Sequence, residues 1–257
     1  MLSNIDILKE LNKNLFIYPL KLANVKGSSI NLSASEHAWS LKTKQSIVVG
    51  GQIVIPAHDT ALIMTEEIVH VSSKLGGLYH SKVKHVSNGM GHIGTTLDPE
   101  WYGKSLIAVH NVSDDDYVIN VGDTFVSLTL YYLNNEEKDA PSNNFSGRCD
   151  VLDKLRIEYD PKKIGLDAID QSNLDGFKKK CRDEQTEEIQ KKLEPFNPPV
   201  LPFYKKRWFK YVVWIVALVV FLLLALCLTQ GDINGIVKDY ILPIVVVIIG
   251  VLVGKIV

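Results

Sequence analysis

One aspartate stands out among the residues whose chemistry could define a function. The segment GHIGTTLDPEWYGKSLIAVHN runs from Gly91 to Asn111 and is typical of two turns followed by a β-strand. Asp98 supplies a carboxylate that could act in catalysis or contact a ligand, and Trp101 and Tyr102 could form the walls of a pocket beside it. Asp98 could equally be a turn former, because Asp-Pro initiates turns readily, and the aromatic residues could be plain barrel packing. The residue types alone leave all three roles open.

A second polar group, in GLYHSKVKHVSNGMGH, comes shortly before this segment. Lys82, Lys84 and His85 indicate either a phosphate-facing patch or ordinary solvated surface. The histidines of this region show no HxH or HExxH spacing, so no metal site is predicted. The three cysteines have unrelated spacings and no CxxC pair, which favours a reducing compartment over a disulfide framework. The net charge of −1 gives no reason to expect nucleic-acid binding.

The hydrophobic and charge patterns change along the chain, and these changes predict the helices and strands that must position the candidate site residues. Residues 1–14 carry leucine and isoleucine at helical spacing and predict a short amphipathic helix. Residues 15–135 are short β-rich runs separated by turn residues, which predicts an all-β barrel or sandwich. Residues 136–203 form a charged helical and proline-rich linker, in which residues 175–194 predict a solvated or self-associating helix.

The remaining residues, 204–257, predict a membrane anchor. Residues 211–229 carry no charge and, at about 1.5 Å per residue, are long enough to cross the roughly 30 Å hydrocarbon layer. Residues 240–257 predict a second span, with a re-entrant or interfacial segment as the alternative. The basic cluster KKRWFK before the first span places the large N-terminal part on the cytoplasmic side. The N-terminus lacks an apolar stretch behind a basic start, so no cleaved signal peptide is expected.

In their order along the chain, these motifs resemble those of the dCTP deaminase and dUTPase superfamily. TLDPEWYGKSLIAVHN, followed by YVINVGDTFVSLTLYYL, is similar to the family's Ile-Asp-Pro-Gly-Trp/Phe-x-Gly turn, its strand ending in Asn and its later Gly-Asp strand. GSSINLSAS at Gly27–Ser35 resembles the first motif of the family, and GLYHSKVKHVSNGMGH resembles its phosphate-contacting motif. The resemblance covers about residues 15–133.

The resemblance implies a mainly β, dUTPase-like barrel or jelly roll that assembles as a homotrimer, with nucleotide pockets at the subunit interfaces. Asp98 would then lie beside the deoxyribose or activate water, and Trp101 or Tyr102 would exclude a 2′-hydroxyl group. Ser81 matches the phosphate-contacting serine. A Mg²⁺ ion would accompany a nucleoside triphosphate, and no other cofactor is implied.

Several departures from the family pattern argue against deamination. By register from Gly103, the glutamate that shuttles protons in deaminases is Ala108 here, and a methyl group cannot transfer a proton. The family's arginine before the phosphate-contacting serine is His80, which lacks a permanently charged fork, although Lys82 restores some positive charge. The acidic residue of the first motif is Asn31, and the glutamine of the late dUTPase strand is Ser127. The candidate ligand-binding residues are Asn31, His80, Ser81, Lys82, Trp101 and Tyr102, and Asp98 is the candidate catalytic residue.

Three functions are consistent with this pattern. The leading one is a sensor or effector, in which a cytoplasmic trimer binds a (deoxy)nucleotide or a related small molecule at its subunit interfaces and passes the signal to its membrane helices. A pyrimidine deoxynucleotide is one possible ligand. Bacterial membrane effectors of antiviral defence share this plan. The second is an active, membrane-tethered dUTP diphosphatase or related hydrolase that uses Asp98. The third is a structural or assembly protein with a dead pocket. A membrane span favours the sensor, because an enzyme that acts on a soluble pool gains little from one.

Overall fold

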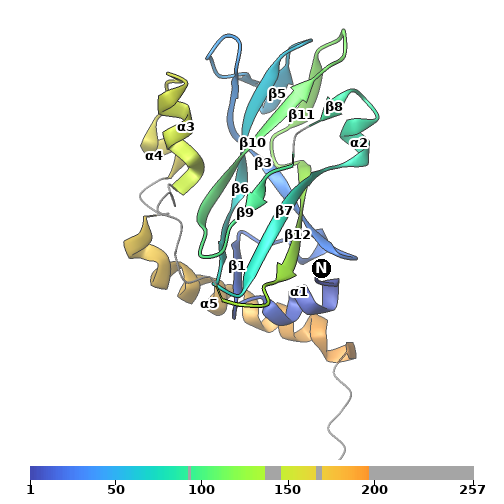
Figure 1. Cartoon of the computed structure of the whole chain (residues 1–257), viewed down its shortest axis with the longest axis vertical. Coiled ribbons are helices and arrows are strands. Elements are labelled where there is room, and N and C mark those ends of the chain that lie inside the picture. Colours follow the sequence, from blue (N-terminus) through green and yellow to red (C-terminus); the bar gives the residue numbers. More distant parts are fainter. Residues whose placement is uncertain (92–93, 137–145, 166–169, 197–257) are drawn as a thin grey trace, which may run out of the picture. The chain divides into compact units, whose positions relative to one another are not determined.

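The computed structural model describes residues 1–91, 94–136, 146–165 and 170–196. The strands lie between residues 15 and 132, and the longer helices come before and after them (Figure 1), which confirms the mainly β class. The strands are β1 (Leu15–Tyr18), β2 (Val25–Lys26), β3 (Ser29–Ser40), β4 (Val48–Val49), β5 (Gln52–Ile55), β6 (Thr60–Val71), β7 (Leu75–Ser81), β8 (Met90–Gly91), β9 (Thr96–Leu97), β10 (Tyr102–Asn111), β11 (Tyr117–Asn120) and β12 (Thr124–Tyr132). The helices are α1 (Asn4–Glu10), η1 (Leu22–Asn24), α2 (Val83–Val86), η2 (Ser146–Arg148), α3 (Cys149–Lys154), α4 (Pro161–Ile164), η4 (Gln171–Asn173), α5 (Leu174–Leu193) and η5 (Glu194–Phe196).

Most of the strands belong to one curled antiparallel sheet. Its order is β8-β10-β6-β3-β12-β7-β9, with β1 added to β6 and β2 added to β3. The long strand β3 bends the sheet, because Ile30 to Ser33 pair with β12 while Ala34 to Ser40 pair with β6. At this crossing both carboxylate oxygens of Glu67 accept the Ser33 amide, at 2.9 and 3.1 Å. The result is a half-barrel whose inner face holds the core.

The core forms because buried and partly exposed side chains alternate along the strands. Side chains in β10 alternate between buried and partly exposed, as the two-residue period of a strand requires. The inward-facing side chains of the large sheet meet Ile53, Ile55 and Ile119 of a small sheet with the order β11-β5-β4. The small sheet lies at one end of the half-barrel (Figure 1), so this end of the core is covered.

The two ends of the large sheet leave a seam between β7 and β10. Among the described residues no ladder joins these two strands, because β9 pairs with the start of β7 and β8 with the end of β10. Side chains link them instead, since the Tyr79 hydroxyl lies 2.5 Å from Oγ of Ser105. The Tyr79 amide of β7 also donates to the Thr95 carbonyl oxygen at 2.9 Å, and the Asp98 turn follows directly after β9.

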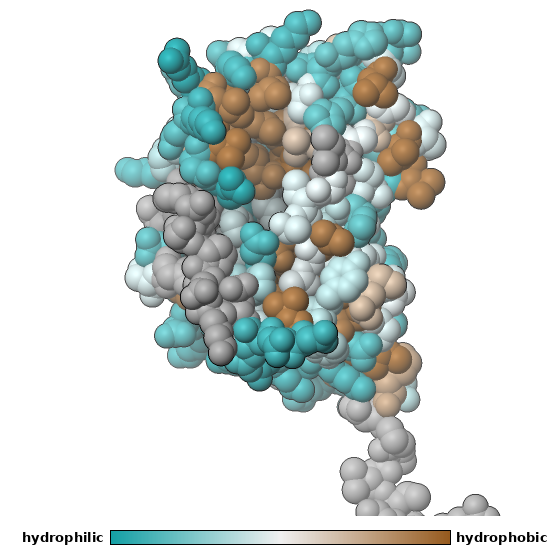
Figure 2. Space-filling model, viewed as in Figure 1, coloured by the Kyte–Doolittle hydropathy of each residue, from teal (hydrophilic) through white to brown (hydrophobic). Residues whose placement is uncertain are grey.

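The helix α5 packs on the β domain, whereas the sequence predicts a solvated or self-associating helix. Phe177, Cys181, Gln185 and Ile189 recur every four residues and are buried. The helix also places cations over aromatic rings of β1, with Nζ of Lys180 3.9 Å from the ring centre of Tyr18. The other faces of α5 are charged, and the lower edge of the described domain, where α5 lies in Figure 1, is largely hydrophilic in Figure 2.

The shorter helices α3 and α4 cover part of the outer face of the sheet. Cys149, Leu152 and Ile164 from these helices form an apolar cluster with Trp39 and Met64 of the sheet. Residues shortly after the last strand therefore fold back on the domain, within the stretch expected to be a linker. The predicted boundaries at 136 and 204 stay predictions, because parts of this region lie outside the described residues.

No helix in the described residues combines the length and apolar character needed to cross a membrane. The predicted spans, about residues 211–229 and 240–257, lie outside the described residues. The membrane anchor and the cytoplasmic orientation therefore stay predictions.

Candidate functional site

Asp98 begins a turn that joins β9 to β10. The Trp101 amide donates to the Asp98 carbonyl oxygen at 3.2 Å, and Glu100 within the turn has a left-handed φ of 59°. The Trp101 carbonyl oxygen accepts the Val71 amide at 3.2 Å and lies 2.9 Å from Nδ1 of His70. These bonds fix the turn to β6, while the Asp98 side chain itself stays exposed.

A cavity of about 390 Å³ opens beside Asp98, a volume typical of small-ligand sites. Its polar lining consists of Tyr79, Thr95, Thr96, Asp98, Ser105 and Arg148, and its apolar lining includes Leu97, Trp101, Leu106 and Ile107. Among the described residues, the Asp98 carboxylate has no ion-pair partner. The cavity thus combines an exposed acceptor, several hydroxyl groups and the indole of Trp101, which suits a ligand with a flat ring and polar edges.

The buried tyrosine of this cavity is a hydrogen-bonding group and not an acid. Burial raises the pKa of Tyr79 well above its usual range, and the nearby Asp98 charge acts in the same direction. The bond to Ser105 lowers this pKa but does not compensate. Tyr79 therefore stays protonated at neutral pH, so it can hold β7 to β10 or donate to a ligand but cannot act as a base.

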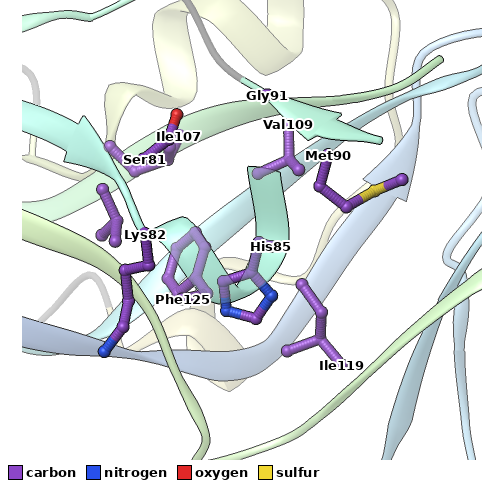
Figure 3. Close-up of a pocket in the computed structure, with 10 residues that line it drawn as sticks. Ser81, Lys82, His85, Met90, Gly91, Ile107, Val109, Ile119 and Phe125 are labelled. Atoms are coloured by element: carbon purple, nitrogen blue, oxygen red, sulfur yellow. The ribbon is translucent and has the colours of Figure 1, made fainter. Parts of the chain in front are cut away.

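The residues Ser81 and Lys82 lie at a second, much smaller cavity (Figure 3). Its volume of about 10 Å³ has room for about one water molecule. Nζ of Lys82 points away from the apolar lining in Figure 3 and donates to Oγ1 of Thr124 at 2.7 Å. In this conformation of a single chain, the pocket is too small for a phosphate group.

His85, next to Ser81 in this small cavity, is held by bonds at both ring nitrogens. Its Nδ1 lies 3.0 Å from the Tyr117 hydroxyl, and its Nε2 lies 3.2 Å from the Thr124 carbonyl oxygen. Burial lowers the pKa of His85, which favours a neutral ring. Of the predicted patch, only Lys84 is exposed, so the expectation of a phosphate-facing surface has little support within one subunit.

His80 and Asn31 lie on the outer face of the sheet. Both are opposite Ser127 in the register, on either side of β12. Oγ of Ser127 donates to Oδ1 of Asn31 at 2.8 Å, and Nε2 of His80 lies 3.0 Å from Oγ1 of Thr129. These residues form a polar row across β7, β12 and β3. They do not line the Asp98 cavity.

Tyr102 is buried beneath α5 and apart from the main core, although it follows Trp101 directly. Its ring centre is 5.2 Å from that of Phe177, and it joins Phe16 and Cys181 in an aromatic cluster beneath α5. Burial raises the pKa of Tyr102 to about 12. Consecutive side chains of a strand face opposite sides, so Trp101 reaches the cavity and Tyr102 does not.

The family resemblance predicts that Ala108 stands where deaminases have a glutamate, and this position is partly covered. Ala108 of β10 packs against the apolar cluster of Trp39, Leu62 and Leu152, beneath α3. The neighbouring side chains of β10 supply no carboxylate either. Among the described residues no group of three histidine, cysteine, aspartate or glutamate side chains could hold a metal ion.

Within one chain, the predicted site residues therefore do not lie together in one pocket. Asp98 and Trp101 share the large cavity, Ser81 and Lys82 share the small one, and Ile107 lines both. Sequence reasoning missed five polar residues of the large cavity, namely Tyr79, Thr95, Thr96, Ser105 and Arg148. The alternation of Tyr79 with Ser81 along β7 could have identified the first, because both then face the same side.

Comparisons with known proteins indicate the class of protein to which the β domain is similar. No family model matches the chain. The dCTP deaminase of Pyrococcus horikoshii is 22% identical over 138 residues, which cover 54% of this chain and 88% of that protein. The dCTP deaminase of Thermococcus gammatolerans is 23% identical over 149 residues, which cover 58% of this chain and 95% of that protein. The chain therefore carries a dCTP deaminase/dUTPase-like domain with distant homology to these archaeal enzymes.

Solved structures of low similarity include members of the same group. The EIAV dUTPase has a TM-score of 0.37 and 17% identity, over 51% of this chain and 97% of that chain. The 2′-deoxycytidine 5′-triphosphate deaminase from Agrobacterium tumefaciens has a TM-score of 0.42 and 10% identity, over 50% of this chain and 46% of that chain.

Proposed function

We propose that this protein binds a pyrimidine deoxynucleotide as a sensor or effector and does not deaminate it. The observation that carries the proposal is the Asp98 cavity, which has the volume of a ligand site and both polar and apolar walls. Among the described residues, Tyr79 and Arg148 are the titratable groups that line it together with Asp98. Tyr79 stays protonated and Arg148 stays charged, so neither can accept a proton at neutral pH.

Deamination needs a group that moves protons between water and the pyrimidine ring, and such transfer contributes about 10²–10⁴-fold. In this chain Ala108 occupies the corresponding strand position and is packed under α3. The archaeal relatives are dCTP deaminases, so the retained scaffold supports nucleotide recognition, and the missing carboxylate argues against their chemistry.

We further propose that the protein works as a homotrimer anchored in the membrane by residues 204–257, with the β domain on the cytoplasmic side. The trimer rests on the family resemblance, and its interface would have to supply the phosphate contacts that the small Ser81 cavity has no room for within one chain. A ligand bound between subunits would then change the packing of the membrane helices, provided that it binds the two arrangements with different affinity.

Isothermal titration of the full-length protein in detergent tests this proposal. The panel contains dUTP, dCTP and dTTP with their ribonucleotide counterparts, each with and without Mg²⁺. We expect saturable binding of at least one pyrimidine deoxynucleotide, and weaker binding of its ribonucleotide. Absence of binding across the panel would remove the nucleotide sensor and leave the structural role.

An active dUTP diphosphatase is the second candidate. The Asp98 carboxylate favours it, because the carboxylate is exposed and makes no ion pair with the residues that the structure describes. This function requires Asp98 to activate a water molecule. It predicts Mg²⁺-dependent release of pyrophosphate that disappears in Asp98→Asn. Saturable binding of dUTP without turnover would exclude it.

A further inference from the structure

The Asp98 cavity receives one residue from outside the β domain. Arg148 ends the short helix η2, which follows the last strand by more than a dozen residues and lies against β10. It is the only cation that lines the cavity among the described residues. The helical extension therefore contributes to this site as well as covering the sheet.

The position of the guanidinium group is set by an acidic neighbour. Nε of Arg148 donates to Oδ1 of Asp150 at 3.0 Å, and Nη2 donates to Oδ2 at 3.2 Å. This fork uses one edge of the planar group, which has five N–H donors in all. Among the described residues, Nη1 has no hydrogen-bond partner, and the side chain is 43% exposed. Arg148 is thus held in place and keeps donors for a ligand.

The charges around Arg148 indicate which part of a ligand its N–H donors can bind. Asp98 and Asp150 are two anions beside the single cation Arg148, so a phosphate group would meet net repulsion here. A neutral heterocycle fits better. Its hydroxyl or N–H groups can donate to Asp98, a carbonyl oxygen can accept from Arg148, and its flat faces can lie against Trp101 and Leu106.

We propose that Arg148 binds the carbonyl oxygen of the pyrimidine ring and so makes the helical extension a determinant of base recognition. This inference rests on the proposed nucleotide binding. It assigns the nucleoside part of the ligand to the Asp98 cavity and places the phosphates elsewhere.

Titration of the full-length Arg148→Ala variant with deoxyuridine, deoxycytidine and their triphosphates tests the assignment. We expect affinity to fall by about tenfold to a hundredfold, because hydrogen bonds to charged groups are worth about 1.5–3 kcal/mol. The loss should be equal for the nucleoside and the triphosphate. Lys154→Ala is the matched control, since it removes an exposed cation of α3 that does not line the cavity.

The possible outcomes show whether the Arg148 assignment fails alone or together with the proposed function. If the wild-type protein binds nucleotides and Arg148→Ala binds them equally well, the inference is wrong and the sensor proposal stands. A loss confined to the triphosphate would assign Arg148 to phosphate and also overturn it. If the wild-type protein binds none of the ligands, both fail. An unchanged unfolding midpoint shows that the variant is folded, and Arg148→Gln replaces it where the midpoint falls.

Discussion

At the scale of single residues, Asp98 is the group on which ligand binding depends most. Its carboxylate faces the cavity, is exposed and makes no ion pair within the described residues. Asp98→Asn should therefore lower nucleotide affinity by about tenfold or more while leaving the free energy of unfolding unchanged. Calorimetric titration and urea unfolding measure the two effects. Asp115→Asn, an exposed carboxylate on a different loop, is the control and should change neither quantity.

The sequence predicted some of the residues that line the Asp98 cavity, but not all of them. The Asp-Pro-x-Trp order indicated a turn and a pocket at Asp98, and the cavity lies there. The sequence places Tyr102 beside Trp101 as a second possible pocket wall, but β10 begins at Tyr102 and its ring packs beneath α5 instead. Arg148 could not be predicted, since the polar stretch before it has no periodicity and only the packing of η2 on β10 brings it to Asp98.

His70 should make the free energy of unfolding depend on pH. Burial, reinforced by the charge of Lys178, lowers its pKa to about 4 in the folded state, from the ordinary histidine value of about 6.5. A lowered histidine pKa means that stability is present above pH 6.5 and is lost as the pH falls toward 4, because the unfolded chain then binds the extra proton. The predicted loss between pH 7.5 and pH 4 is about 3 kcal/mol at about 1.4 kcal/mol per pKa unit.

The comparison is with His70→Gln, which removes the titrating ring and can still donate to the Trp101 carbonyl oxygen. Urea unfolding across this pH range should show a steeper loss for the wild-type protein than for the variant. Parallel pH profiles would contradict the role assigned to His70.

At the scale of elements, α5 is held to the sheet by few side chains. Phe177 is 8% exposed and packs on Tyr102. Phe177→Ala should lower the free energy of unfolding by about 3 kcal/mol, because it leaves a cavity in this cluster. The exposed Lys179→Ala on the same helix should change the free energy by less than about 0.5 kcal/mol. Equal effects of the two substitutions would mean that α5 is solvated, as its sequence suggests.

The strands were predictable as a class, and the packing of the helices was not. Alternating apolar residues and regular turns identify a β domain, since only one face of each strand reaches the core. In α5 the buried face has only four residues among many charges, a signal too sparse to separate a docked helix from a solvated one. The covering of Ala108 by α3 likewise depends on tertiary contacts that no local pattern contains.

At the scale of the whole molecule, the central claim is recognition without turnover. Distant homology to dCTP deaminases accounts for the scaffold. The resemblance predicts a proton-transferring glutamate at position 108 in deaminases, and this chain has alanine there. The proposed trimer would complete the phosphate site that one chain leaves too small, and the proposed membrane helices would receive the signal.

The most direct test is to titrate the full-length protein with dUTP and dCTP in the presence of Mg²⁺, and then to analyse the nucleotide recovered from the cell by chromatography. The account predicts saturable heat with at least one of the two, and complete recovery of the intact triphosphate. Recovery of dUMP with pyrophosphate, or of dUTP from dCTP, would contradict it, as would the absence of any binding heat.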